Sequence, residues 1–284
     1  MDYPFAIVDV FADAPLGGNP LAVVAGPPPD AVMARIAREF NQSETTFVMA
    51  PTRAGADWRL RSFTAAGVEV FGAGHNALGA WWWLAASGRL ELTAERSVLH
   101  QEIGPLVLPV EISASGISMM QDAPEFGAVA SDRSALALAL GLDVLDLAIP
   151  DLPAQVVSTG APHLLVPARN AAVVDRARPD HAKLLRVLKS VSGEGCYLFA
   201  LDPAPYARFF NPTVGLWEDP ATGTAAGPLA CYLVHYGRAA RGEPVYVAQG
   251  HAMGRPSRIE ARVTETAVAI TGRGFVVAEG HLRF

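Results

Sequence analysis

The chain of 284 residues has few cysteines, few lysines and no long apolar run. Its two cysteines, Cys196 and Cys231, are too few for a disulfide framework, so we expect a reducing, cytoplasmic location. The residues from Tyr3 to Val8 do not form the basic, apolar and cleavage segments of a signal peptide, and none is expected. The most apolar run, residues 77–86, is too short to span a bilayer, which predicts a buried helix and no membrane partner.

Several signatures of common functions are also missing. Lysine occurs only at Lys183 and Lys189, the net charge is −6, and no basic run is present, so we expect no nucleic-acid partner. The chain contains no P-loop, no G-x-G-x-x-G, no H-E-x-x-H and no G-x-S-x-G sequence. Five of its histidines are scattered singly, without metal-ligand spacing, so we predict no metal site: His100, His163, His181, His235 and His251.

What the sequence does contain is an internal repeat. Residues 59–89, moved forward by 149 positions, match residues 208–238. The identical pairs are Arg59 and Arg208, Thr64 and Thr213, Glu69 and Glu218, Gly74 and Gly223, Ala77 and Ala226, Leu84 and Leu233, Gly88 and Gly237, and Arg89 and Arg238. Each copy has an extended segment, a Gly-rich turn, an apolar helix and a glycine stop. The repeat predicts two similar domains of about 140 residues with a cleft between them.

Hydrophobic periodicity and turn residues predict the elements. We expect strands at 4–10, 21–25, 45–49, 57–63, 196–201, 206–210, 244–248, 257–263 and 267–279, with several more in 90–121. We expect helices from an N-cap at Asp30 to about Phe40, from Gly74, from a cap at Ser131 or Asp132, over 180–191, and from about Thr224. Many short strands and few helices predict an α+β fold with largely antiparallel sheets. We divide it into residues 1–118, to which a final strand near 270–284 could return, and residues 119–284.

The two Gly-rich turns are candidate binding elements. They read Gly72-Ala73-Gly74-His75-Asn76 and Ala221-Thr222-Gly223-Thr224-Ala225-Ala226-Gly227, and each opens a repeat helix. Free backbone N–H groups at a helix start attract anions, and small residues let a ligand approach the backbone. The turns therefore suggest a small carboxylate ligand. The alternative is that both are ordinary tight turns.

Three ionisable residues flank these turns. Glu44 follows Asn41-Gln42-Ser43 at a junction of loop and strand, where partial desolvation would suit general acid/base work. His75 lies in the first helical turn, where the helix dipole favours a neutral ring. Asp219 precedes Pro220 just before the second turn. Their structural alternatives are a surface glutamate at a helix end, a hydrogen-bonded structural histidine and an Asx-turn aspartate.

These motifs together resemble a known family. The carriers are Asp9-Val10-Phe11, Gly18-Asn19-Pro20-Leu21-Ala22-Val23, Asn41-Gln42-Ser43-Glu44-Thr45-Thr46-Phe47, Arg61-Ser62-Phe63-Thr64, Gly74-His75, Glu218-Asp219-Pro220-Ala221-Thr222-Gly223-Thr224-Ala225-Ala226-Gly227-Pro228-Leu229 and Met253-Gly254-Arg255-Pro256-Ser257. The chain resembles the phenazine-biosynthesis PhzF isomerase family, which has the diaminopimelate epimerase fold. The resemblance covers nearly the whole chain.

The resemblance implies two pseudo-symmetric domains, each a barrel-like, mostly antiparallel sheet around a central helix. It also implies a homodimer, an active site between the domains, and no cofactor. In the phenazine pathway such an enzyme isomerises trans-2,3-dihydro-3-hydroxyanthranilate, and a glutamate carries a proton from C3 to C1. By this match Glu44, His75 and Asp219 are catalytic. The expected substrate-binding residues are Ser43, Gly74, Asn76, Gly223 and Thr224.

Related epimerases and racemases of the fold use a pair of cysteines, one in each Gly-rich turn. Here the first turn carries Ala73 and the second carries Thr224-Ala225-Ala226, so a dithiol mechanism lacks its residues. Asn76 and Ala77 also depart from the Cys-Gly-His-Ala/Pro-Thr pattern of many relatives, and they could reshape the pocket. We therefore expect an isomerase that uses Glu44. Two other functions stay open: a non-thiol racemase or epimerase, and a carboxylate-binding protein without turnover.

Overall fold

The chain divides into two compact units. The computed structural model describes residues 2–90 and 95–284. Unit 1 comprises Met1–Met120 and Thr271–Phe284, and unit 2 comprises Gln121–Ile270. The C-terminal strand β18 (Gly274–Arg283) pairs antiparallel with β1 (Asp2–Val10) along its whole length. Both chain ends therefore belong to the sheet of unit 1.

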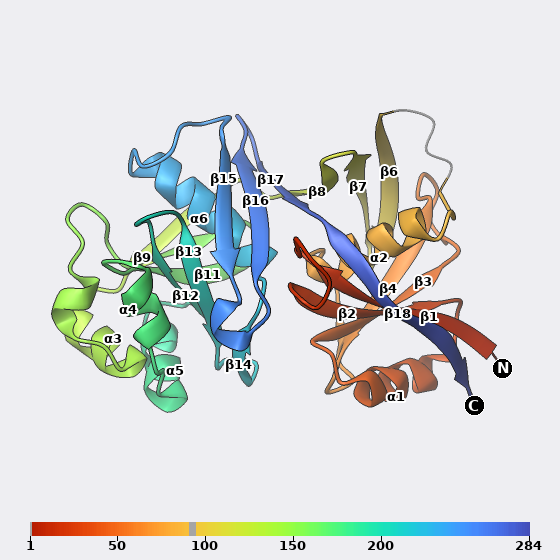
Figure 1. Ribbon diagram of the computed structural model, residues 1–284, viewed down its shortest axis with the longest axis horizontal. Coiled ribbons are helices and arrows are strands. Elements are labelled where there is room, and N and C mark those ends of the chain that lie inside the picture. The colour runs from red at the N-terminus through yellow and green to blue at the C-terminus, as the bar shows by residue number, and fades with distance from the viewer. Residues whose placement is uncertain (1, 91–94) are drawn as a thin grey trace. The chain divides into compact units, whose positions relative to one another are not determined.

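In unit 1 the sheet wraps around helix α2 (His75–Ala86) (Figure 1). Besides β1 and β18, its strands are β2 (Asn19–Ala25), β3 (Glu44–Met49), β4 (Trp58–Thr64), β5 (Glu69–Val70), β6 (Arg96–Ile103), β7 (Leu106–Ser113) and β8 (Gly116–Gln121). The pairs β2–β3 and β4–β6 are parallel, while β1–β2, β3–β4, β4–β5, β6–β7 and β7–β8 are antiparallel. Most of α2 is buried, from Asn76 to Leu84, as expected for a central helix.

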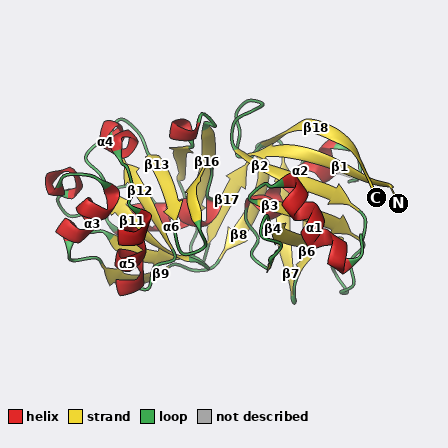
Figure 2. Ribbon diagram, turned by 90° about the horizontal axis from the view of Figure 1, so that it is seen from below, coloured by secondary structure: helices red, strands yellow, loops and turns green. Residues whose placement is uncertain are grey.

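Helix α1 (Asp30–Phe40) covers the other face of this sheet, against β3 and β4 (Figure 2). Its buried residues Met33 and Ile36 pack with Phe47 and Met49 of β3. Because side chains alternate along a strand, Glu44, Thr46 and Val48 of β3 point the opposite way, toward α2. This alternation directs the Glu44 side chain to the N-terminal end of α2.

Unit 2 has the same plan around helix α6 (Gly223–His235). Its strands are β9 (Glu125–Val129), β10 (Gln155–Ser158), β11 (Pro162–Pro167), β12 (Gly195–Ala200), β13 (Tyr206–Asn211), β14 (Leu216–Asp219), β15 (Pro244–Gln249), β16 (Ser257–Val263) and β17 (Val268–Gly272). Helices α3 (Arg133–Leu140), α4 (Ala171–Arg176) and α5 (His181–Ser190) form an outer layer near β11 and β12 (Figures 1 and 2). Two 3-10 helices, η1 (Val144–Leu147) and η2 (His251–Met253), complete the unit.

The pairing order of the two units is the same. In unit 2, β11–β12 and β13–β15 are parallel, and β10–β11, β12–β13, β13–β14 and β15–β16 are antiparallel. The strands β2, β3, β4 and β5 of unit 1 thus correspond to β11, β12, β13 and β14. Strand β9 pairs antiparallel with β10, as β18 pairs with β1. The predicted α+β fold of two pseudo-symmetric units, each with a central helix, is confirmed.

The registers correct one part of the predicted repeat. Arg61 donates from Nε and Nη2 to Glu69 at 2.7 and 2.8 Å, and Arg208 makes the same paired contact with Glu218 at 2.8 and 2.8 Å. The counterpart of Arg208 is therefore Arg61, and the sequence match with Arg59 was wrong. The match of Thr64 with Thr213 fails for the same reason. The hairpin segment from Arg208 to Glu218 is two residues longer than the one from Arg61 to Glu69, and the β13–β14 pairing has a register shift between Phe209 and Asn211, so one fixed offset cannot align both the helix and the strand.

Two local expectations differ from the structure. The N-cap of α1 is Pro29, not Asp30; Asp30 is the first helical residue, and its carboxylate accepts from Arg61 at 2.6 Å. The single strand expected at 267–279 is two strands, β17 and β18. The stretch 90–121 contains β6, β7 and β8, but its residues 91–94 lie outside the described residues.

Within the described part of the chain, no helix combines the length and the apolar character needed to cross a membrane.

Candidate active site

In unit 1, Glu44 and His75 form a close pair. Glu44 is the first residue of β3 and His75 the first of α2, and their Oε2 and Nε2 atoms lie 3.0 Å apart. Both atoms are buried, and the contact is short without having the alignment of a hydrogen bond. The Glu44 side chain is 22% exposed, and its other oxygen, Oε1, accepts no hydrogen bond from a described residue. One carboxylate oxygen is thus held against an imidazole, and the other is open to a ligand.

Asn76 organises the Gly-rich turn beside this pair. Its Oδ1 accepts from the backbone N–H of Gly74 at 2.8 Å, and its Nδ2 donates to Gly72 O at 2.9 Å and to Ser62 Oγ at 3.0 Å. Asn76 is only 4% exposed. The expectation that it binds substrate stays a prediction, but its amide atoms are engaged inside unit 1. The same contact occupies the N–H of Gly74, so that group is not free for the carboxylate suggested above.

Ser43 stands just before β3, half-buried in the turn that follows α1. With Glu44, Gly74, His75 and Asn76 it lies at one end of unit 1, where β3 and α2 both begin. Five of the predicted site residues are therefore gathered at one end of the central helix.

In unit 2, Asp219 is the last residue of β14 and belongs to a buried polar network. Its Oδ2 accepts from Thr222 Oγ1 at 2.5 Å, and its backbone carbonyl accepts from Gln249 Nε2 at 2.7 Å. Gln249 Oε1 in turn accepts from Tyr197 Oη at 2.9 Å and from the backbone N–H of Thr222. These contacts hold the chain from Asp219 to the start of α6 in one conformation.

Gly223 and Thr224 form the first turn of α6. The Gly223 carbonyl accepts from Gln121 Nε2 at 3.1 Å, and Thr224 Oγ1 lies 3.4 Å from Nε2 of the buried His163. Thr224 is half-buried, and Gly223 is buried. Unit 2 therefore places Asp219, Gly223 and Thr224 together at the N-terminal end of its central helix, as unit 1 does with its own set.

The family model described as phenazine biosynthesis-like protein (PhzC-PhzF) matches residues 8–280. The chain belongs to the PhzC-PhzF family. It is 34% identical over 287 residues to the trans-2,3-dihydro-3-hydroxyanthranilate isomerase of Pseudomonas fluorescens, covering 97% of this chain and 98% of the relative.

Solved structures agree on the fold. A PhzF-family protein of Bacillus anthracis is 29% identical, covers 100% of both chains, and superposes with a TM-score of 0.90. A probable proline racemase from Agrobacterium radiobacter is 12% identical over 99% of this chain and 93% of its own, with a TM-score of 0.69, which shows the fold alone. The protein is thus an isomerase of the PhzC-PhzF family with a diaminopimelate epimerase-like fold.

The two thiols of this PhzC-PhzF isomerase lie away from both helix starts. Cys196 is on β12 and Cys231 in the interior of α6, and both are buried and free. Burial raises the pKa of Cys196 to about 12, and it raises the pKa of Cys231 to about 11. Such thiols are poor nucleophiles and bases at neutral pH. The prediction that a thiol pair is not the acid/base couple is consistent with these positions.

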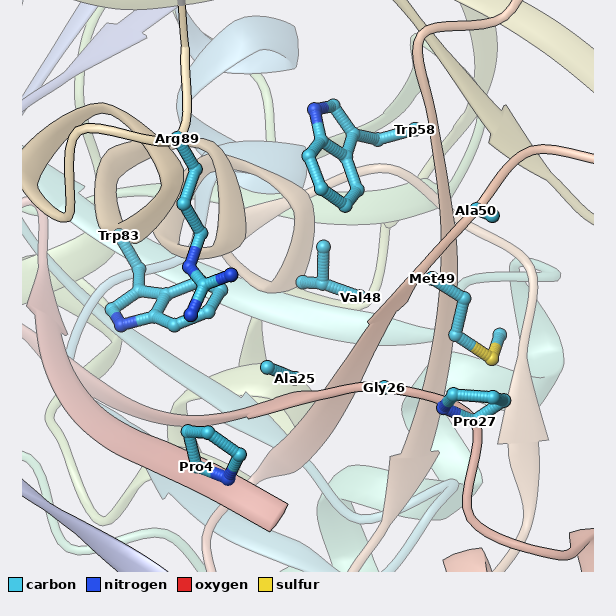
Figure 3. A pocket seen from close by; sticks show the side chains of 10 residues that line it. All are labelled: Pro4, Ala25, Gly26, Pro27, Val48, Met49, Ala50, Trp58, Trp83 and Arg89. Atoms are coloured by element: carbon cyan, nitrogen blue, oxygen red, sulfur yellow. The ribbon is translucent and has the colours of Figure 1, made fainter.

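Unit 1 of the isomerase also contains an apolar cavity of about 330 Å³ (Figure 3). Its walls include Trp58, Trp83 and Met49, and the guanidinium of Arg89 lies 4.9 Å from the centre of the Trp83 ring. Met49 ends β3 and Trp83 is near the end of α2, whereas Glu44 and His75 begin these elements. No carboxylate, imidazole or thiol lines this cavity among the described residues, so it offers no general acid or base.

Sequence reasoning missed the residues that hold the site residues in place. Thr46 and Ser62 lie on neighbouring strands with their hydroxyl oxygens 2.9 Å apart, and Thr46 also donates to the Asn76 carbonyl. Tyr197, Thr222 and Gln249 do the equivalent work in unit 2. A polar residue on the buried face of an apolar strand was the available signal, but only the register shows which partners it meets.

Proposed function

We propose that this isomerase moves a carbon-bound proton on a small, cyclic amino- or hydroxy-carboxylic acid, with Glu44 as general acid and base. The substrate we would test first is trans-2,3-dihydro-3-hydroxyanthranilate, because the Pseudomonas fluorescens relative carries that name at 34% identity over nearly the whole chain. A second relative, from Clostridium acetobutylicum, is 31% identical and named only an uncharacterized isomerase, which leaves the substrate itself to experiment.

The observation that carries the proposal is the Glu44–His75 pair at the start of α2. Glu44 Oε1 is open to a ligand, while Oε2 is held against the ring. In the proposed step the carboxylate takes the proton from C3, and the electron pair of that C–H bond moves through the ring to C1. C1 then takes the proton from the same carboxyl group. Atoms and charge balance without another reactant, and one positioned carboxylate does both transfers.

The remaining predicted residues would hold the substrate. We assign His75 to orienting Glu44 and the substrate. We assign Ser43, at the same end of unit 1, to substrate binding. We assign Asp219 to a substrate amine or hydroxyl, since its carboxylate lies at the start of α6. Gly223 and Thr224 would bind the substrate carboxylate through backbone N–H groups of the first helical turn and the Thr224 hydroxyl.

The test uses wild type, Glu44→Gln and a matched control, Glu39→Gln, whose side chain is exposed on α1. Each is incubated with trans-2,3-dihydro-3-hydroxyanthranilate in deuterated buffer and followed by NMR. We expect ring isomerisation by wild type and Glu39→Gln, and a loss of about 10³-fold or more in Glu44→Gln, because the amide cannot accept a proton from carbon.

The other outcomes separate the rival functions. Full activity in Glu44→Gln would remove Glu44 from the mechanism. Exchange of a substrate α-hydrogen with inversion at that centre would indicate an epimerase or racemase. Binding without any exchange would indicate a carboxylate-binding protein. The homodimer stays a prediction from the family resemblance, and the cytoplasmic location stays a prediction from the low cysteine content. Sedimentation velocity would determine the oligomeric state.

A further inference from the structure

His163 is a buried imidazole that the proposed mechanism does not use. It lies on β11 and is 3% exposed. Its Nε2 is 3.4 Å from Thr224 Oγ1, and its Nδ1 is buried with no hydrogen-bond partner among the described residues. The His163 ring packs edge-to-face against the Phe209 ring, with ring centres 4.9 Å apart and an angle of 78° between the ring planes. A buried histidine in an apolar sheet lowers the stability of the fold unless its ring nitrogens have hydrogen-bond partners.

The correspondence between the units shows how unusual this position is. Because Arg61 is equivalent to Arg208, the strand registers equate Glu44 of β3 with Gly195 of β12, and Leu21 of β2 with His163 of β11. His163 and Gly195 are direct partners on the parallel strands β11 and β12. At the helix start the repeat equates His75 with Thr224. Where unit 1 has a carboxylate from its β3 beside the first helical residue, unit 2 has a glycine on β12 and an imidazole from the adjacent strand.

Gly195 leaves the space that this imidazole needs. A Cβ added at Gly195 would lie 3.1 Å from His163 Nδ1 and 2.4 Å from Phe209 Cζ. The second distance is shorter than real Cβ contacts allow, so any larger residue would force Phe209 or His163 to move. Gly195, His163 and Phe209 thus form one packed arrangement directed at Thr224.

The protonation state of His163 follows from its surroundings. Burial lowers the pKa of His163 to about 4, so the ring is neutral at pH 7. A neutral ring has one N–H. If Nδ1 carried it, a buried donor would lack a partner, which is rarer and costlier in proteins than an unpaired acceptor. We therefore place the proton on Nε2, the nitrogen next to Thr224.

We propose that His163 is a positioning residue for Thr224: its Nε2–H donates to Thr224 Oγ1 and thereby leaves the hydroxyl proton to a substrate oxygen. Thr224 then acts as a hydrogen-bond donor with a fixed direction, which suits a carboxylate or hydroxyl oxygen and disfavours an ammonium group. The 3.4 Å separation is long for a hydrogen bond, and such contacts often shorten when a ligand binds. This inference rests on the proposed role of Thr224 in substrate binding.

The first experiment needs no substrate. Long-range 1H–15N NMR of histidine-labelled protein reports which ring nitrogen of His163 carries the proton, in wild type and in Thr224→Val. We expect a neutral ring protonated at Nε2 from about pH 5.5 to about pH 8. We also expect the resonance of Nε2 to shift in Thr224→Val. Protonation at Nδ1, or a His163 resonance unchanged by loss of the Thr224 hydroxyl, would overturn the proposal.

The second experiment measures turnover in a double-mutant cycle. His163→Leu introduces the residue that unit 1 carries at the equivalent position, and His163→Gln keeps a side-chain N–H donor. We expect His163→Leu to lower kcat/KM about tenfold in the wild-type background and to have little further effect in Thr224→Val, with His163→Gln partly active. Equal losses in both backgrounds would show that His163 does not act through Thr224. A wild type inactive on the tested substrate would instead count against the proposed function, while the NMR result would still stand on its own.

Discussion

At the scale of single residues, Asn76 holds the turn that precedes His75. It lies one position after His75 and ties the turn from Gly72 to Gly74 to Ser62 of β4 through three hydrogen bonds. Thr46 completes the network, because its hydroxyl donates to the Asn76 carbonyl.

We predict that Asn76→Ala lowers the free energy of unfolding by about 1–3 kcal/mol, because it leaves the Gly74 N–H without its partner and removes the hydrogen bonds to Gly72 O and Ser62 Oγ. It should also lower kcat by tenfold or more, since a small displacement of a catalytic group has a large effect on rate. Urea unfolding and steady-state kinetics measure the two effects. Asn76→Asp, which keeps the acceptor for Gly74, is the comparison variant. A stable and fully active Asn76→Ala enzyme would contradict the positioning role.

At the scale of elements, the equivalent residues Arg61 and Arg208 each bind a glutamate on the next strand of their hairpin, but their other contacts differ. Arg61 holds Glu69 and the exposed Asp30. Arg208, only 7% exposed, holds Glu218, and its Nη1 also donates to the backbone carbonyls of Val174 and Ala177 near the end of α4. Removing Arg208 therefore leaves the Glu218 carboxylate without its paired donor and removes the hydrogen bonds to these carbonyls.

We predict that Arg208→Met costs about 3–5 kcal/mol of unfolding free energy, the range for breaking a buried pair by removing one partner. Arg208→Lys should not restore it, because a lysine cannot make the paired contact. Arg61→Met should cost less, since Asp30 is exposed. Chemical denaturation measures all three, with the exposed Arg186→Met of α5 as a control expected to change little. Equal stabilities of Arg208→Met and Arg186→Met would contradict this account.

At the scale of the whole molecule, acid should destabilise the fold in two stages. The folded pKa of His163, about 4, lies below its ordinary value of 6.5, so the unfolded chain binds more protons between these values. Stability is therefore present above pH 6.5 and is lost as the pH falls toward 4, by on the order of 3 kcal/mol. His163→Leu should remove this slope. Denaturation of both proteins across this range measures it, and identical pH profiles would show that His163 does not cause it.

Two buried carboxylates, Glu102 and Asp146, make stability depend on pH in a lower range. Burial by itself raises the pKa of Glu102, but hydrogen bonds from Thr52 and Arg53 and the charge of Arg59 outweigh it and lower the pKa. Burial also opposes the shift of Asp146, where the hydrogen bonds from Arg176, Asp143 and Arg169 together lower the pKa. Both contributions are present above the ordinary pKa values of 4.5 and 3.8 and are lost below them.

The sequence by itself determined the elements, the repeat and the candidate residues. Alternation and turn signals located most strands, and the Gly-rich turns marked the starts of both central helices. These are local signals, because backbone conformation depends on neighbouring residues. The same signals singled out Glu44, His75 and Asp219, and the structure brings Glu44 to His75 within unit 1.

Tertiary structure alone decided the partners of these residues. The equivalence of Arg61 with Arg208 depends on strand register, which the irregular β13–β14 pairing shifts without leaving a clear trace in sequence. The Asn76 and Gln249 networks and the His163–Thr224 contact join residues far apart in the chain. Burial makes each unpaired polar atom costly, so the fold selects these long-range pairings, and local sequence does not show them.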